Sequence, residues 1–211
     1  MKKLEDLYVA ILTGQLEQAM DVTKWAIEQN ISPTEIVNQY MVKAMEDIGY
    51  RFESGKAFVP NLLLSARAMK GSLDLLKPLM RGKNMSSRGT IVIGTVKGDL
   101  HDIGKNLVAS MFEGCGFEVI NLGVDVSTTQ FIKAIEEFHA DILCMSALLT
   151  TTMIYMEEVI HKIEQVGLRN QIKIMVGGAP VNMSFAQKIG ADAYSENANQ
   201  AVIVAKQFLI S

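Results

Sequence analysis

Three short segments rich in polar residues and glycine each follow a run of apolar residues that predicts a β-strand. These segments are Gly98-Asp99-Leu100-His101-Asp102-Ile103-Gly104, Ser146-Ala147-Leu148 and Gly177-Gly178-Ala179-Pro180. In a parallel sheet with the strand order 2-1-3-4-5, the strands before them are neighbours and their carboxyl ends line one crevice. That crevice would contain one imidazole, a carboxylate two residues before it, a hydroxyl group and two glycines.

The imidazole of His101 is a candidate metal ligand, and Asp99 could accept the proton on its other ring nitrogen. A zinc or iron ion requires three or four protein ligands, and the sequence holds no further His, Cys or paired carboxylate at a matching spacing. A metal at this site would have to bring its own equatorial ligands, as the metal of haem or of a corrinoid does. The protein would then supply an axial ligand.

Several of these residues also have a purely structural explanation. Asp99 could cap the helix that follows, Ser146 could be an ordinary hydroxyl at the end of a strand, and Gly177-Gly178 could form a simple turn. His139 and His161 lie among charged residues and are interpreted as solvated surface side chains.

The elements that would position the three segments alternate between short β-branched runs and amphipathic stretches, which is typical of βαβ units. The predicted strands are Thr90–Gly94, Phe117–Asn121, Asp141–Met145, Ile172–Val176 and Asp192–Tyr194. The predicted helices lie at about Gly104–Glu113, Thr128–Phe138, Thr152–Val166, Met183–Ile189 and Ala198–Leu209. The pattern predicts a doubly wound, flavodoxin- or Rossmann-like domain with a five-stranded parallel sheet over residues 90–211.

The first 83 residues carry apolar side chains at helical spacing and predict an up-down bundle of four helices. Ser32 is predicted to cap the third helix, with Pro33 in its first turn and Glu35 completing a capping box. The fourth helix begins near Pro60, and Pro78 is expected to bend or end it. A polar stretch at 81–89 follows, and the linker between the domains is predicted at 84–89.

The composition excludes several classes of protein. The chain has 211 residues and a formal net charge of −3, so its overall charge does not favour nucleic acid. The longest apolar runs fall far short of the roughly 20 residues that a membrane span needs. Charged residues follow Met1 closely, without the apolar region of a signal peptide, so we expect a cytoplasmic protein without a membrane anchor. Cys115 and Cys144 are expected to be reduced.

The three segments together resemble a known motif. Asp99-x-His101-x-x-Gly104, followed by Ser146-x-Leu148 and by Gly177-Gly178, is similar to the DxHxxG, SxL and GG pattern of cobalamin-binding domains. Those domains bind the cofactor with its own base displaced by a histidine. The helical half, with Phe58-Val59-Pro60 and Leu62, resembles the cap bundle of methionine synthase and of corrinoid proteins. The chain thus resembles the two-domain corrinoid proteins of methanol, methylamine or methoxyaryl methyltransferase systems.

The resemblance implies roles for individual residues. His101 would bind cobalt in place of the cofactor's dimethylbenzimidazole, and Asp99 and Thr152 would tune its imidazole. The displaced nucleotide tail would enter the crevice beside Ser146 and Leu148, where the two glycines leave room for it. The resemblance assigns cofactor binding to Gly98, Asp99, Leu100, His101, Asp102, Ile103, Gly104, Ser146, Leu148, Thr150, Thr152, Gly177, Gly178 and Ala179, and to Phe58 and Leu62 of the helical half.

The same resemblance implies a function. The chain would carry a methyl group on cobalamin, as methylcobalamin or cob(I)alamin, without catalytic residues of its own. A substrate-specific methyltransferase would methylate the corrinoid, and a second methyltransferase would move the methyl group to a thiol or to tetrahydrofolate. A reductive activase is a further implied partner.

Three rival interpretations remain at this stage. A cobalamin-dependent sensor would share the two domains, but the first 30 residues form no basic recognition face. The small subunit of an adenosylcobalamin mutase would not need a helical cap of this kind. In a signalling domain without a cofactor, the motif spacing would be accidental.

Overall fold

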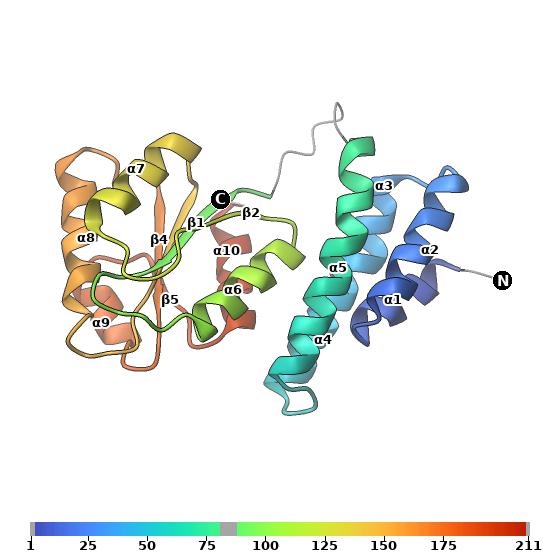
Figure 1. Cartoon of the computed structure of the whole chain (residues 1–211), viewed down its shortest axis with the longest axis horizontal. Helices are drawn as coiled ribbons and strands as arrows, with labels where there is room; N and C mark the ends of the chain where they lie inside the picture. The colour runs from blue at the N-terminus through green and yellow to red at the C-terminus, as the bar shows by residue number, and fades with distance from the viewer. Residues whose placement is uncertain (1–2, 81–87, 210–211) are drawn as a thin grey trace. The chain divides into compact units, whose positions relative to one another are not determined.

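The computed structural model describes residues 3–80 and 88–209. The chain divides into two compact units, one of residues 1–86 with 110–116 and one of residues 87–109 with 117–211. The first unit contains the N-terminal helices and the second contains a parallel sheet (Figure 1). Most of the predicted linker, residues 84–87, lies outside the described residues.

The helical unit is built from amphipathic helices whose apolar stripes meet in one core. They are α1 (Leu4–Leu12), α2 (Leu16–Glu28), α3 (Pro33–Glu35), the π-helix η1 (Ile36–Met41), α4 (Val42–Glu53) and α5 (Val59–Met80). Leu7 and Ile11 of α1 are fully buried, as are Leu62, Met69 and Leu76 of α5 to within 1%. The segments α3, η1 and α4 follow one another without a break and form the third predicted helix.

The third helix differs from its prediction in two respects. Pro33 occupies its first turn as expected, but the Ser32 side chain makes no capping hydrogen bond, so the predicted capping box is wrong. The chain also widens into a π-helix over Ile36–Met41, and this turn brings Ile36, Val37 and Met41 into the core together. In the fourth helix Pro78 lies inside α5, so it does not end the helix.

The second unit contains a five-stranded, all-parallel sheet with the order β2-β1-β3-β4-β5, as predicted. The strands are β1 (Thr90–Thr95), β2 (Glu118–Asn121), β3 (Ile142–Ser146), β4 (Lys173–Gly177) and β5 (Ala193–Tyr194). The three central strands are almost wholly buried because helices cover both faces.

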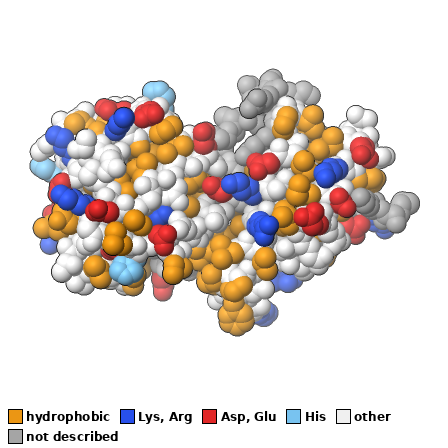
Figure 2. Space-filling model, viewed as in Figure 1, with side chains coloured by type: hydrophobic (Ala, Val, Ile, Leu, Met, Phe, Trp, Pro, Cys, Tyr) orange, Lys and Arg blue, Asp and Glu red, His pale blue; other side chains and the backbone are white. Residues whose placement is uncertain are grey.

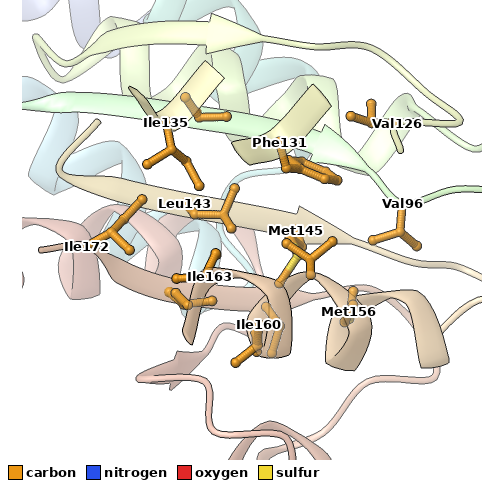
Figure 3. Close-up of a cluster of buried hydrophobic side chains, with 14 of the residues drawn as sticks. Val96, Val126, Phe131, Ile135, Leu143, Met145, Met156, Ile160, Ile163 and Ile172 are labelled. Atoms are coloured by element: carbon orange, nitrogen blue, oxygen red, sulfur yellow. The ribbon is translucent and has the colours of Figure 1, made fainter. Parts of the chain in front are cut away.

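The helices that follow the strands are α6 (Ile103–Gly114), whose residues 110–114 fall in the first unit, α7 (Thr128–Phe138), α8 (Ile154–Gln165), α9 (Met183–Lys188) and α10 (Ala198–Phe208). Helices α7, α8 and α9 contribute to one core cluster on one face of the sheet, and α6 and α10 lie on the other face (Figure 1). Figure 3 shows Phe131 of α7 and Ile160 of α8 packed beside Leu143 and Met145 of β3. This packing fixes the strand ends that carry the candidate site.

The surface carries both charged and apolar side chains, in keeping with the composition of the chain. On the face shown in Figure 2, basic and acidic side chains are interspersed with hydrophobic ones. Among the described residues, no helix is long and apolar enough to cross a membrane.

Candidate functional site

The loop between β1 and α6 carries most of the candidate residues and turns back over the end of β1. Gly98 has a φ of +77°, which glycine adopts without steric cost. The Thr95 hydroxyl donates a hydrogen bond to the carbonyl of His101 (2.9 Å), and the Asp99 N–H donates to the carbonyl of Val96 (3.2 Å). This turn buries Asp99 completely and leaves His101 at the surface.

The buried carboxylate of Asp99 accepts five hydrogen bonds. Its Oδ1 accepts from the backbone N–H of His101 (3.1 Å) and from Nδ1 of the His101 ring (2.7 Å). Its Oδ2 accepts from the N–H groups of Leu148 (2.7 Å) and Leu149 (3.2 Å) and from the hydroxyl of Thr152 (2.9 Å). All five donors lie outside α6, so the alternative that Asp99 merely caps that helix is wrong.

These bonds determine the charge of Asp99. Burial alone would raise its pKa, but hydrogen bonds from the Leu148 N–H, from the ring and N–H of His101 and from the Thr152 hydroxyl outweigh burial. The pKa of Asp99 therefore lies well below that of an ordinary carboxyl group. Asp99 is ionised at neutral pH and can only accept, so Nδ1 of His101 is the donor. A neutral His101 then has a free lone pair on Nε2.

The position of His101 leaves the Nε2 lone pair able to bind a group from outside the domain. Its side chain is 51% exposed, although its partner Asp99 is fully buried. Leu100 and Ile103, on either side of it in sequence, are 72% and 86% exposed. An oriented imidazole beside exposed apolar side chains suits a large ligand that presents a metal and an apolar surface.

The second predicted segment lies beside the first, as expected. Ser146 is the last residue of β3 and pairs with Thr95 on β1 and with Gly177 on β4. The turn that follows brings the N–H of Leu148 and the hydroxyl of Thr152 to Asp99. Thr150 lies exposed in the same turn.

The structure itself explains why two glycines occur at the end of β4, where Gly177 is the last residue of the strand and Gly178 follows it. A Cβ on Gly178 would lie 1.9 Å from the carbonyl oxygen of Ala147, and its φ of +124° also favours glycine. A Cβ on Gly177 would lie 3.1 Å from the carbonyl oxygen of Ser195. The close approach of the segments at Ala147 and Gly178 thus requires a glycine at position 178 even before any ligand binds. Ala179 follows at the same edge of the sheet.

Gly104 differs from these glycines. It lies in the first turn of α6, where alanine would favour the helix, and a Cβ there would meet no atom within 4 Å. Neither backbone strain nor packing among the described residues explains it. The open space beside it, three residues after His101, is available to a bound group.

Sequence reasoning missed a polar cluster around one buried lysine behind this loop. Lys105 is 3% exposed, and its Nζ donates to Oδ1 of Asn106 (2.5 Å) and of Asn121 (2.7 Å). Asn106 donates through Nδ2 to the carboxylate of Asp102 (2.9 Å). Burial lowers the pKa of Lys105, and the charge of Asp102 opposes that shift. The cluster ties the start of α6, including Asp102, to the end of β2.

A second missed residue is Asp125, in the loop after β2. Its Oδ1 accepts a hydrogen bond from the N–H of Gly98 (2.7 Å). An isolated aspartate after an edge strand has no spacing pattern that would have identified it.

The two candidate residues of the helical unit differ in exposure. Phe58 is 69% exposed, so it is not a core residue of the bundle. Leu62, one turn later, is fully buried. His139 and His161 of the other unit are exposed, as interpreted, and Cys115 and Cys144 are buried and not joined in a disulfide.

Residues 3–80 and 88–209 contain no group of three or more His, Cys, Asp or Glu side chains that could hold a metal ion. His101 therefore fits a metal that arrives with its own equatorial ligands. It does not fit a bare zinc or iron ion.

Comparison with known families identifies such a ligand. Residues 89–203 match the model of a B12 binding domain, and residues 3–77 match a second family model that is also described as a B12 binding domain. The chain is 42% identical over 207 residues to the dimethylamine corrinoid protein of Methanosarcina barkeri, covering 98% of this chain and 97% of that protein. It is 39% identical over 212 residues to a corrinoid protein of Desulfitobacterium hafniense (strain Y51), covering 99% and 98%.

Solved structures agree with these relatives. A cobalamin-binding protein from Desulfitobacterium hafniense DCB-2 has a TM-score of 0.83 at 31% identity, with 99% of both chains covered. A chain of the methanol:cobalamin methyltransferase complex from Methanosarcina barkeri has a TM-score of 0.86 at 28% identity, covering 99% of this chain and 80% of that one. The chain described here therefore belongs to the cobalamin-binding corrinoid proteins of methyltransferase systems.

Proposed function

We propose that this protein carries methyl groups on cobalamin, with Nε2 of His101 as the axial ligand of cobalt in place of the cofactor's own base. The observation that carries the proposal is the 2.7 Å contact between the ionised Asp99 and Nδ1 of His101. It fixes the tautomer in which Nε2 can bind a metal. Cobalamin, when bound, supplies the cobalt centre that accepts and releases the methyl group.

The residues of the chain hold and tune that ligand. Asp99 keeps the proton on Nδ1 and strengthens Nε2 as a donor, and Thr152 and the N–H of Leu148 keep Asp99 ionised. The buried, ionised carboxylate would therefore hold the orientation of His101 toward the cofactor.

The remaining site residues would contact the cofactor. The exposed side chains of Leu100 and Ile103 and the open space at Gly104 would face the corrin ring. The displaced nucleotide tail would run along the sheet edge. The residues proposed there are Gly98, Asp102, Ser146, Leu148, Thr150, Gly177, Gly178 and Ala179. Phe58 would belong to a cap that covers the cofactor, whereas Leu62, which is fully buried, would support that cap from the core of the helical unit.

The methyl donor is proposed from the relatives. Proteins that are 39–46% identical to this chain are named dimethylamine or trimethylamine corrinoid proteins. We infer that the partner enzyme is a methylamine methyltransferase, that a second methyltransferase removes the methyl group, and that a reductive activase restores the cofactor. The second and third partners rest on the family resemblance.

The test is methyl loading by defined partners. The protein, reconstituted with hydroxocobalamin and reduced, is incubated with purified methylamine or methanol methyltransferases and their substrates, and methylation is followed by visible absorption. We expect methylation with a methylamine enzyme, and loss of at least ten-fold in rate for His101→Ala. Absence of methylation with every partner would contradict the carrier role. Methylation with only the methanol enzyme would contradict the proposed donor.

A further inference from the structure

The segment after β2 stays beside the end of β1, beyond the paired residues of β2, and a further bridge joins Val96 to Val126. The Leu122 N–H donates to the carbonyl of Ile93 (2.8 Å), and the Thr95 N–H donates to the carbonyl of Gly123 (3.0 Å). The Val126 N–H then donates back to the carbonyl of Thr95 (3.0 Å). These bonds hold residues 122–126 against the start of the loop that carries Asp99 and His101.

Asp125 extends this contact to Asp99 itself. Its Oδ1 accepts from the N–H of Gly98 (2.7 Å), and its own N–H donates to the carbonyl of Asp99 (3.0 Å). One residue therefore binds the backbone on both sides of the Gly98–Asp99 peptide. The carboxylate that this backbone positions accepts a hydrogen bond from Nδ1 of His101.

The backbone of Asp125 suggests that this contact is specific. Its φ is +53°, in the left-handed region that residues other than glycine, asparagine and aspartate rarely adopt. In that conformation its carboxylate reaches the Gly98 N–H and its own N–H reaches the Asp99 carbonyl. A glycine would relieve the backbone but could not provide the carboxylate.

We propose that Asp125 is a positioning residue for the axial ligand: it clamps the backbone of Asp99 and thereby fixes the orientation of the His101 imidazole. The inference rests on the proposed role of His101 and adds a residue to it. Removing the Asp125 carboxylate should loosen the Gly98–Asp99 peptide, so that Asp99 no longer selects one tautomer of His101.

The test compares three variants. Asp125→Gly removes the carboxylate but tolerates the positive φ, and Asp125→Asn keeps both an acceptor oxygen and that tolerance. His139→Gly is the matched control, because His139 also has a positive φ (+48°) in the same unit but caps α7. All are measured without cofactor at pH 8 by NMR, as Gly98 amide exchange and as the tautomer of ¹⁵N-labelled His101, together with the thermal unfolding midpoint.

The affinity for hydroxocobalamin provides a second measurement. For Asp125→Gly we expect amide exchange at Gly98 to be about ten-fold faster and His101 to populate both tautomers. We also expect the affinity for hydroxocobalamin to be about ten-fold weaker, which is typical when a residue that orients a metal ligand is removed. The asparagine variant and the His139→Gly control should match the unaltered protein.

Three results would overturn the proposal. The first is an unaltered His101 tautomer and hydroxocobalamin affinity in Asp125→Gly. The second is an Asp125→Asn variant whose tautomer and affinity differ from those of the unaltered protein. The third is loss of the folded state in Asp125→Gly, since a positioning role requires an intact fold. If the unaltered protein does not bind hydroxocobalamin, the proposed function fails, whereas the tautomer and exchange measurements still decide the role of Asp125.

Discussion

A single carboxylate connects the parts of the candidate site at the scale of the residue. Asp99 is buried, yet it stays ionised because its donors come from both the β1–α6 loop and the β3–α8 turn. Each hydrogen bond to a charged acceptor contributes about 1.5–3 kcal/mol. The same bonds that hold the loops together therefore also orient His101.

Asp99→Asn should lower the stability of the cofactor-free protein by about 2 kcal/mol at pH 7, because an amide places N–H groups against some of these donors. The pKa of Asp99 is lower in the folded than in the unfolded chain. Its stabilisation is thus complete above the unfolded pKa near about 4 and is lost as the pH falls through the folded value. Urea unfolding of both proteins between pH 7 and pH 3.5 should show the stability difference shrinking only below about pH 4; a constant difference would contradict the assignment.

Two glycines of the motif should respond in opposite ways. Gly178→Ala should destabilise the cofactor-free protein by about 2–4 kcal/mol, because its Cβ would meet Ala147 and its φ is positive. Gly104→Ala should stabilise it by about 0.5–1 kcal/mol, since α6 gains helix propensity without a clash.

The affinity for hydroxocobalamin is a second property in which Gly104→Ala should differ from the unaltered protein. We expect Gly104→Ala to weaken the affinity despite its greater stability, as the new methyl group occupies space that the corrin ring would use. Equal affinity in Gly104→Ala and the unaltered protein would show that the open space at Gly104 does not face the cofactor.

At the scale of the elements, α5 contains a buried hydroxyl that has no partner among the described residues, Ser72. Ser65, two turns earlier on α5 and equally buried, donates to the carbonyl of Leu12 (3.3 Å). Ser72→Ala should therefore raise the free energy of unfolding by about 1 kcal/mol, and Ser65→Ala should not. Chemical denaturation of the two variants distinguishes them, and a loss of stability in Ser72→Ala would contradict the prediction.

The strands and helices of the sheet unit were predictable to within two residues at most boundaries. Their β-branched runs are buried on both faces, and their helices carry clear apolar stripes. The Asp99–His101 pair and its neighbour Ser146 were also predictable, because strand order alone brings these loops together. Asp125 and the Lys105 cluster were not predictable, because they depend on how the loop after the edge strand bends.

In the helical unit, the local sequence pattern did not predict two features of the third helix correctly. Ser32-Pro33-Thr34-Glu35 has the composition of a capping box, yet the Ser32 side chain does not bond the helix N-terminus. The π-helix at Ile36–Met41 leaves no mark in the sequence, because an apolar stripe looks the same when one turn widens. At the π-helix, the buried side chains of Ile36, Val37 and Met41 accompany the wider turn.

At the scale of the whole molecule, a carrier must present its cofactor to a donor and an acceptor enzyme and protect it between these encounters. The proposed cap residue Phe58 is exposed in the helical unit, so Phe58→Ala should leave the fold intact. We expect the variant, reconstituted with methylcobalamin, to photolyse several-fold faster than the unaltered protein. Val9→Ala, which truncates another exposed side chain of the same unit, is the control. Equal rates in all three proteins would contradict a protective role for Phe58.

The central claim is that Nε2 of His101 binds cobalt. Electron paramagnetic resonance of the reconstituted protein in its cobalt(II) form tests it most directly, with ¹⁴N-histidine and ¹⁵N-histidine samples compared. We expect coupling to one axial nitrogen that changes from a triplet to a doublet on histidine labelling and disappears in His101→Ala. A splitting that is unaffected by histidine labelling would identify the cofactor's own base as the ligand and would contradict the account.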